Sequence, residues 1–219
     1  MYDAVNALAI PESANAENVI VAGYINGKYA WSASDWARFP KAVRLRIDVL
    51  GNDPLGSDIL DVEPGNLGTP IISPGMSLEE VEHIWELLCD AAATWVETRH
   101  SKGIQSTCYV QESRKNQLAN KLQGKSLFFM AQWGIKQSEA EALLRGAECA
   151  IQFENTPGYD VSVALDNWHP APSAAPKPPA EPEAPYITGA TIGTELDGNA
   201  LKVTLTLKYN NNKEKVEVY

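Results

Sequence analysis

Two carboxylates stand two residues apart in the segment Ile59–Gly65, which reads ILDVEPG. If this segment is a strand, Asp61 and Glu63 project from the same face, because side chains alternate along a strand. Carboxyl groups spaced ~7 Å apart repel each other as anions, which raises the pKa of one of them. A protonated acid beside a charged one suits the cleavage of a glycosidic bond. The alternative is a solvated strand end with two ordinary acids.

A third acid, Asp160, follows the turn at Thr156–Gly158 and opens a later apolar run. Its carboxylate could lie at the same open end of the fold as those of Asp61 and Glu63. It could instead only cap the turn. We expect the three acids to converge, because the carboxyl ends of parallel strands are where barrel enzymes build their active sites.

Aromatic residues lie at or beyond the ends of several expected strands. Sugar rings present apolar C–H faces that pack on aromatic rings, and Tyr and Trp add a hydrogen-bonding group. The candidates for glycan binding are Tyr24, Trp31, Tyr109, Trp133, Tyr159 and Trp168, with core or rim packing as the alternative. Trp85 and Trp95 differ, because they belong to one apolar stripe of a long expected helix and should be core residues.

Short apolar runs alternate with helical patterns along the first 168 residues. The expected strands are Val19–Gly23, Val43–Leu50, Ile59–Val62, Thr107–Val110, Leu127–Ala131, Ala150–Phe153 and Val161–Leu165. Capping boxes at Ser77/Glu80 and Ser138/Glu141 predict the starts of two helices, and a further helix runs through SRKNQLANKL. This alternation predicts an α/β protein with a parallel sheet, and we favour a small or irregular β/α barrel over an open sheet.

The remainder of the chain has a different composition. Residues 169–185 read HPAPSAAPKPPAEPEAP, a proline-rich linker without core-forming residues. Strict alternation in LKVTLTLKY and KEKVEVY predicts a β-hairpin of Leu201–Tyr209 and Lys213–Tyr219, with ITGATIG as a possible third strand. The expected organisation is an N-terminal arm (1–18), a barrel (19–168), the linker (169–185) and a C-terminal hairpin element (186–219).

Charge and composition exclude several classes of function. With 28 acidic and 18 basic residues the net charge is -10, which disfavours binding to nucleic acid or to an anionic membrane. The start of the chain does not have the pattern of a secretory signal peptide. The three cysteines and three histidines form no metal-binding pattern, and no nucleotide-binding glycine motif occurs. We therefore expect neither a metal ion nor another cofactor.

Several segments, in their order along the chain, resemble the family 25 glycoside hydrolases, the Chalaropsis-type lysozymes. They are similar also to glycoside-hydrolase-like domains in proteins of actinobacteria and their phages. The segments are VIVAGYING, KAVRLRIDVLG, DILDVEPG, TCYV, FFMAQWG and AIQFENTPGYDVSVALDNW. The resemblance implies an irregular β/α barrel that acts on peptidoglycan glycan. It implies that Glu63 is the general acid, that Asp61 orients the substrate or stabilises positive charge, and that Asp160 is the acid of the last strand.

One position departs from the family pattern, which has an Asp on the first strand. We expect this chain to carry Asn26 there, and an amide cannot supply the negative charge. Three functions follow. The first is a phage virion-associated, tail-located protein whose barrel cleaves or binds cell-wall glycan, the second is a non-catalytic structural or receptor-binding tail protein, and the third is a free lysin or an unrelated enzyme. In the first two, the expected location is the virion, the chain is present in several copies, and the C-terminal hairpin binds other phage structural proteins by strand addition.

Overall fold

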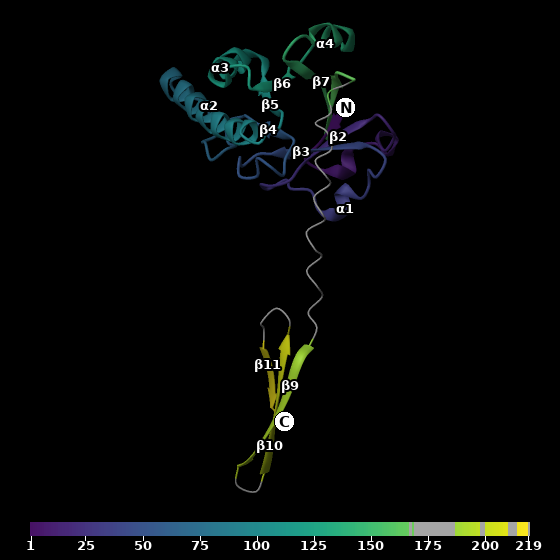
Figure 1. The fold of residues 1–219 in the computed structure, drawn as a ribbon, viewed down its shortest axis with the longest axis vertical. Helices are drawn as coiled ribbons and strands as arrows, with labels where there is room; N and C mark the ends of the chain where they lie inside the picture. Colours follow the sequence, from purple (N-terminus) through teal and green to yellow (C-terminus); the bar gives the residue numbers. More distant parts are fainter. Residues whose placement is uncertain (167, 169–186, 198–199, 210–213, 219) are drawn as a thin grey trace. The chain divides into compact units, whose positions relative to one another are not determined.

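The computed structural model describes residues 1–166, 168, 187–197, 200–209 and 214–218, in two units, Met1–Ser173 and Ala174–Tyr219. The first unit is a closed eight-stranded barrel in which neighbouring strands follow the chain order (Figure 1). Its strands are β1 (Tyr2–Asp3), β2 (Ile20–Tyr24), β3 (Val43–Asp48), β4 (Ile59–Asp61), β5 (Ser106–Gln111), β6 (Ser126–Ala131), β7 (Glu148–Thr156) and β8 (Tyr159–Ala164). The prediction of an irregular β/α barrel is confirmed.

The barrel is mixed rather than all-parallel. Strands β1 to β7 run parallel, whereas β8 is antiparallel to both β7 and β1. The turn between β7 and β8 contains only Pro157 and Gly158, and Gly158 has a φ of 108°. A connection this short can join only antiparallel strands, because a parallel pair needs a long crossover.

The barrel begins at Tyr2, within the segment that we expected to be an arm. Strand β1 pairs with β2 on one side and with β8 on the other, and it thereby closes the barrel. A strand of two residues is too short to show any alternation, so periodicity could not detect it.

The helices flank the strands. They are η1 (Ala7–Ala9), η2 (Glu12–Ala14), α1 (Ala33–Trp36), α2 (Leu78–His100), α3 (Glu112–Leu122) and α4 (Gln137–Leu143). The capping box of Ser77 and Glu80 at the start of α2 is confirmed. The start expected at Ser138 is wrong, because α4 begins after Lys136, whose backbone N–H donates to Glu139 Oε2 at 2.7 Å.

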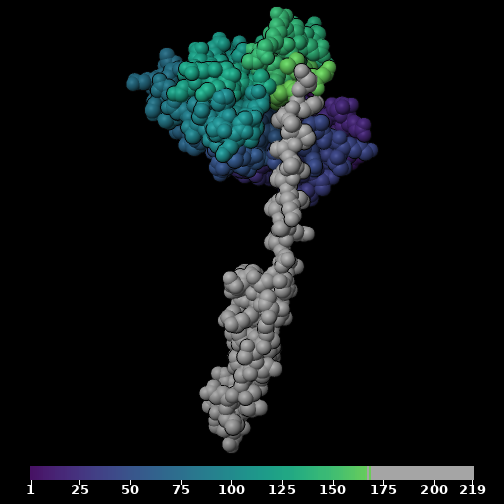
Figure 2. Space-filling view, in the orientation of Figure 1, coloured from purple at the N-terminus to yellow at the C-terminus, as the bar shows by residue number. Residues whose placement is uncertain are grey.

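Alternation along the strands separates a barrel interior from an outer layer. Ile59 of β4 packs with Ala22, Ile47 and Phe129 inside the barrel, whereas Leu60 packs against α2 and α3 on the outside. Trp85 and Trp95 are 1% and 2% exposed, which confirms that they are core residues. In the space-filling view the teal surface of α2 and α3 forms a continuous flank of the barrel (Figure 2).

The second unit is an antiparallel three-stranded sheet in the order β11-β10-β9. Its strands are β9 (Ile187–Asp197), β10 (Ala200–Tyr209) and β11 (Glu214–Val218). The hairpin expected from LKVTLTLKY and KEKVEVY is present, and ITGATIG belongs to a full third strand. The expected proline-rich linker at 169–185 lies outside the described residues.

Three further findings bear on chemistry. Cys89, Cys108 and Cys149 are buried free thiols. Within the described ranges, no helix is long and apolar enough to cross a bilayer. The same part of the chain contains no group of three or more His, Cys, Asp or Glu side chains arranged to hold a metal ion.

Candidate active site

The acidic motif lies at the carboxyl end of β4 and faces the barrel interior. Ile59 belongs to the interior cluster and Leu60 to the outer one, so Asp61 points inward again by alternation. Asp61 is 5% exposed, and Glu63 just beyond the strand is partly exposed. The motif therefore presents one buried and one accessible carboxyl group at the same end of the barrel.

Asp160 and Asp3 come to the same end from the two strands that close the barrel. They occupy paired positions in the antiparallel register of β8 and β1. Directly opposed residues of an antiparallel pair have Cβ atoms roughly 5 Å apart and share one face. Because β8 runs opposite to the other strands, its first residues lie at their carboxyl ends. Asp3, Asp61, Glu63 and Asp160 are called the acid cluster below.

The pKa values of the acid cluster show that its members share one space. Burial and the neighbouring charge of Asp160 raise the pKa of Asp3 to about 8. Burial, followed by the charge of Glu63, raises the pKa of Asp61 well above its usual range, and a hydrogen bond from Asn66 offsets part of this shift. The two most buried acids of the cluster thus favour the protonated form.

The more accessible acids respond to the same environment. Burial and the charge of Asp160 raise the pKa of Glu63. Burial raises the pKa of Asp160 as well, against a hydrogen bond from Gln152 that lowers it. All four carboxyl groups thus have raised pKa values, and carboxyl groups that titrate together in one site can serve as an acid and a base.

Several buried oxygen atoms of this region have no hydrogen-bond partner among the described residues. They include Asp3 Oδ2, Asp61 Oδ1, Asp160 Oδ1 and Gln152 Oε1. None of the ion pairs found in the described part of the chain involves the acid cluster. Native proteins pair nearly all buried polar groups, so this concentration of unpaired acceptors makes the acid cluster a candidate site for a ligand that donates hydrogen bonds.

Two of the predicted aromatic residues lie beside the acid cluster. Burial and the charges of Asp61, Asp3, Glu63 and Asp160 raise the pKa of Tyr24. Burial and the charge of Glu63 first among the acids raise the pKa of Tyr109. Tyr109 also pairs with Asp61 in the register of β5 and β4, and its ring packs edge-on against Phe129 at 4.8 Å. The hydroxyls of both tyrosines stay protonated and are donors at the mouth.

Two other aromatic residues are at the same end of the barrel. Trp133 follows β6 and is 48% exposed. Tyr159 precedes Asp160, and its ring lies 5.8 Å from that of Tyr2. Trp133 is thus the accessible aromatic surface of this end, and Tyr159 packs against the first strand.

The remaining two aromatic candidates are buried, with Trp31 8% and Trp168 5% exposed. Trp31 is buried beside η1, and its Nε1 donates to the carbonyl oxygen of Ala4 at 3.1 Å. Trp168 is buried at the opposite end of the barrel, where its Nε1 donates to Thr107 Oγ1 at 3.2 Å. It follows the antiparallel strand β8, whose last residues lie at the amino ends of the other strands. Both are core residues, which agrees with core packing, the alternative to glycan binding given in the sequence analysis.

The expectation that Asn26 occupies the first strand is wrong. Asn26 follows β2, and its side chain braces two loops by donating to Asp48 Oδ1 at 2.7 Å and accepting from the backbone N–H of Val49 at 3.0 Å. The first strand of the barrel is β1, and it carries Asp3.

Two residues of the site escaped the sequence analysis. Asp3 stood in a segment without any periodic pattern, in a strand of two residues. Gln152 is 2% exposed and lies in the interior of β7. Its signal was an amide within the apolar run AIQF, because a buried amide in a strand needs polar partners.

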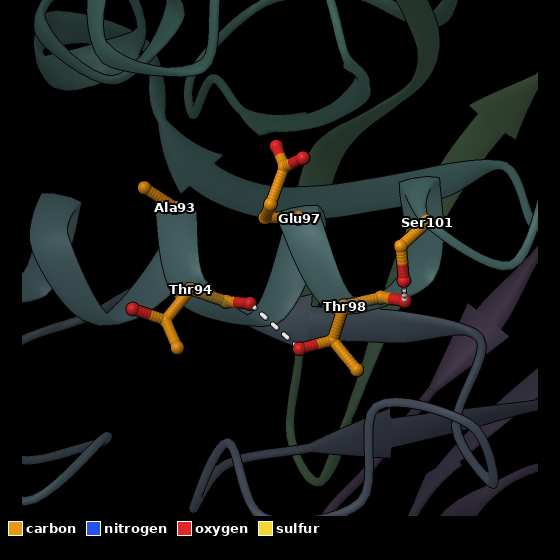
Figure 3. A pocket seen from close by; sticks show the side chains of 5 residues that line it. All are labelled: Ala93, Thr94, Glu97, Thr98 and Ser101. Carbon is orange, nitrogen blue, oxygen red and sulfur yellow. Dashed lines mark hydrogen bonds between the residues drawn. The ribbon is translucent and has the colours of Figure 1, made fainter.

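Two surface hollows lie away from the acid cluster. One, lined by Glu12, Asn15, Arg38 and Phe39, is near the start of β3. The other follows one face of α2 near its carboxyl end, where Figure 3 shows Thr98 Oγ1 donating to the Thr94 carbonyl oxygen. Glu97 of this second hollow pairs with Lys125, which precedes β6, so the hollow is at the amino ends of the strands.

Comparison with protein-family models, with curated proteins and with solved structures found no match to this chain. The fold itself is an eight-stranded mixed barrel with interleaved helices, loosely similar to a TIM barrel.

Proposed function

We propose that the barrel is a glycoside hydrolase directed at the glycan of bacterial peptidoglycan. The observation that carries the proposal is the acid cluster, in which four carboxyl groups with raised pKa values meet at the carboxyl ends of the strands. Barrel enzymes place their chemistry at this end, and glycosidases work with a protonated and a charged carboxyl group on either side of the scissile bond.

The roles follow from burial and accessibility. Glu63 is the accessible acid whose pKa is raised, so it protonates the glycosidic oxygen as the bond to the sugar C1 breaks. The positive charge that develops on the sugar ring is stabilised by the carboxylate of Asp160, while the protonated Asp61 orients the substrate through a hydrogen bond. Water then adds its oxygen to C1 and returns a proton to a carboxylate of the cluster, which completes hydrolysis.

The side chains around the acid cluster suit a carbohydrate substrate. The tyrosines Tyr24 and Tyr109 supply hydroxyl donors, and Trp133 supplies an exposed ring for stacking on a sugar. The unpaired oxygens of Asp3, Asp61 and Gln152 accept the hydroxyl and amide protons that a glycan carries. An alternative, a non-catalytic barrel, is favoured less because Asp3 supplies the first-strand acid.

The test is the Glu63→Gln variant incubated with purified peptidoglycan, with released muropeptides measured by mass spectrometry. The amide keeps the shape but cannot act as a general acid, so turnover should fall by about 10²–10⁴-fold while folding and glycan binding persist. The matched control is Glu86→Gln, which changes an exposed acid on α2 and should leave turnover unchanged. Wild-type protein that binds peptidoglycan and releases nothing would instead support the non-catalytic tail protein.

We further propose that the chain is a tail component of a phage virion, with the C-terminal unit as its anchor to other structural proteins. This part of the proposal is supported by the resemblance of the barrel segments to phage glycoside-hydrolase-like domains. Virions assembled with a chain that ends after Ser173 should lack the protein when their composition is measured by mass spectrometry. Incorporation of the shortened chain would locate the anchor in the barrel.

A further inference from the structure

Strand β7 contains an irregularity beside the acid cluster. Gln152 of β7 pairs with Ser162 of β8, and Glu154 pairs with the preceding residue of β8, Val161. Phe153 is therefore an extra residue on β7 and forms a β-bulge. Bulges are common next to active sites, where they re-aim a side chain. The residue just before this bulge is Gln152, which is 2% exposed.

The side chain of Gln152 points into the barrel. Ile151 and Phe153 belong to the outer apolar layer, whereas Ala150 packs in the barrel interior. Gln152 therefore follows Ala150 inward by alternation. On the other side of β7, the residue of β6 in register with Gln152 is Ala131. Its small side chain leaves space for the amide beside it.

Asp160 is the diagonal neighbour of Gln152 across the pair of β7 and β8. It precedes Ser162, the direct partner of Gln152, by two residues and therefore shares its face. Diagonal neighbours are ~7–8 Å apart, within reach of a long side chain. Gln152 makes a hydrogen bond to Asp160. Because a carboxylate only accepts hydrogen bonds, the amide nitrogen Nε2 is the atom of Gln152 that faces Asp160.

Asp160 is the member of the acid cluster whose charge acts on the others. Its charge is among the causes that raise the pKa values of Asp3 and Glu63. Burial raises the pKa of Asp160 itself, and the hydrogen bond from Gln152 opposes this shift. A donor to the charged form of an acid favours that form, so the amide of Gln152 helps to keep Asp160 ionised.

The fold alone does not require an amide at this position. Gln152 Oε1 is buried without a hydrogen-bond partner among the described residues. An unpaired buried oxygen lowers stability relative to an apolar group of the same shape. Asp160 Oδ1 is likewise without a partner in this part of the chain, so the amide holds the carboxyl group through its other oxygen.

We propose that Gln152 is the positioning residue of Asp160, which it holds from the side of β7 while Asp160 Oδ1 stays free for the substrate. The inference rests on the proposed glycosidase function, in which the carboxylate of Asp160 stabilises the positive charge on the sugar ring. Gln152 acts through Asp160, so its removal weakens the charge stabilisation that Asp160 provides.

Other titratable groups surround Asp160 and also influence its pKa. They are the ammonium group of Met1, Asp3 of β1, Tyr24 of β2, and Asp61 and Glu63 at the end of β4. Gln152 carries no charge, so its replacement alters the pKa of Asp160 without adding or removing a charge in the cluster.

The first test is a ¹³C NMR titration of the Asp160 carboxyl group in the full chain. Methionine is similar in length to glutamine and has no donor, so Gln152→Met should raise the pKa of Asp160 by about one pH unit. The matched control is Ser162→Ala, at the buried position paired with Gln152, and it should leave this pKa unchanged. An unmoved pKa in Gln152→Met, or an equal shift in the control, would overturn the proposal.

The second variant, Gln152→Asn, keeps a polar amide inside the barrel. Its side chain is shorter by one methylene group, which withdraws the amide from Asp160. The pKa of Asp160 should rise as it does in Gln152→Met. A wild-type pKa in Gln152→Asn would overturn the requirement for the reach of glutamine.

The third test measures muropeptide release from purified peptidoglycan across pH. The acid limb of the Gln152→Met profile should move upward by about one pH unit, with about tenfold slower release below it, because Asp160 must be ionised to act. Equal slowing at every pH would indicate a merely structural role and overturn the proposal. The titration needs no substrate. If the pKa of Asp160 shifts but the wild type releases nothing, the hydrolase function fails, whereas the positioning of Asp160 by Gln152 is retained.

Discussion

Asp48 and Asp61 are both buried aspartates at the carboxyl ends of neighbouring strands, yet their surroundings are opposite. The Asp48 carboxylate points outward and accepts five hydrogen bonds: from Asn26 Nδ2, Trp95 Nε1 and the backbone N–H groups of Leu50, Gly51 and Asp53. Asp61 points inward, and its Oδ1 has no partner among the described residues. A buried carboxyl group that makes all its hydrogen bonds supports the fold, whereas one with hydrogen bonds missing is a candidate for a functional site.

Arg99 belongs with Asp48 on the structural side of this comparison. Arg99 is 2% exposed, and its guanidinium donates to the carbonyl oxygens of Pro54, Ser57 and Gln105 at 2.5–3.1 Å. It also stacks over Trp95, 4.8 Å from the ring centroid. One side chain thus holds the loop before β4, the end of α2 and the start of β5 together.

The largest change in stability is expected for Arg99→Met. The variant fills the space but leaves three carbonyl groups without their donor, so the free energy of unfolding should fall by about 3–5 kcal/mol. Urea unfolding followed by tryptophan fluorescence measures this. Arg114→Met, which removes a partly exposed ion pair with Glu82, should cost about 1 kcal/mol or less. Equal losses for the two variants would contradict the structural role of Arg99.

The next largest effect separates the two aspartates directly. Asp48→Asn replaces an acceptor of five donors with an amide that itself donates, and it should lower the free energy of unfolding by about 2–3 kcal/mol. The same change at Asp61 replaces a buried carboxyl group whose Oδ1 has no partner and should leave stability equal or higher, while turnover of peptidoglycan falls. A larger loss of stability at Asp61 than at Asp48 would invert the comparison.

Asp3→Asn tests the acid cluster through the pH dependence of the free energy of unfolding. Because the pKa of Asp3 is about 8 in the folded protein and 3.8 in the unfolded chain, the native state holds an extra proton between these values. The wild-type free energy of unfolding therefore falls as pH rises from ~4 to ~8, by at most about 1.4 kcal/mol per pH unit. Asparagine does not titrate, so the variant should match the wild type near pH 4 and exceed it near pH 8.

Asp35→Asn is a control for which the expected pH dependence of the free energy of unfolding has the opposite sign. Hydrogen bonds from Ser32 lower the pKa of the partly exposed Asp35 carboxyl, so its stabilising contribution is present above the unfolded pKa and disappears as pH falls. This variant should be the less stable chain at neutral pH and approach the wild type in acid. Parallel pH profiles for the two variants would contradict the assignment of a shared, buried site around Asp3.

The smallest effect is expected from removal of the second unit. The networks of Asp48 and of Asp61 are both built from residues of the unit Met1–Ser173. A chain that ends after Ser173 should therefore unfold cooperatively, with a free energy within about 0.5 kcal/mol of the barrel transition in the full chain. Circular dichroism during urea titration measures this, and loss of the cooperative transition would show that the barrel depends on the second unit.

Much of the architecture was determined by the sequence alone. Apolar runs of four to eight residues located seven strands of the barrel, and the Ser77/Glu80 box located the start of α2. Alternation in ILDVEPG already assigned Asp61 and Glu63 to one face, because a period of two is a local property of an extended chain. The strict alternation of LKVTLTLKY did the same for the C-terminal sheet.

Tertiary structure alone decided which residues meet. Asp3 joins the acid cluster because β1 closes the barrel between β2 and β8, a pairing between the first and last strands that no local pattern encodes. The same closure moved Asn26 from the expected first strand to a loop beyond β2. Trp31 and Trp168 were indistinguishable from glycan-binding residues by type, and only the direction of β8 and the position of η1 made them core residues. Periodicity reports the face on which a side chain lies, whereas the register and direction of distant strands determine what that face meets.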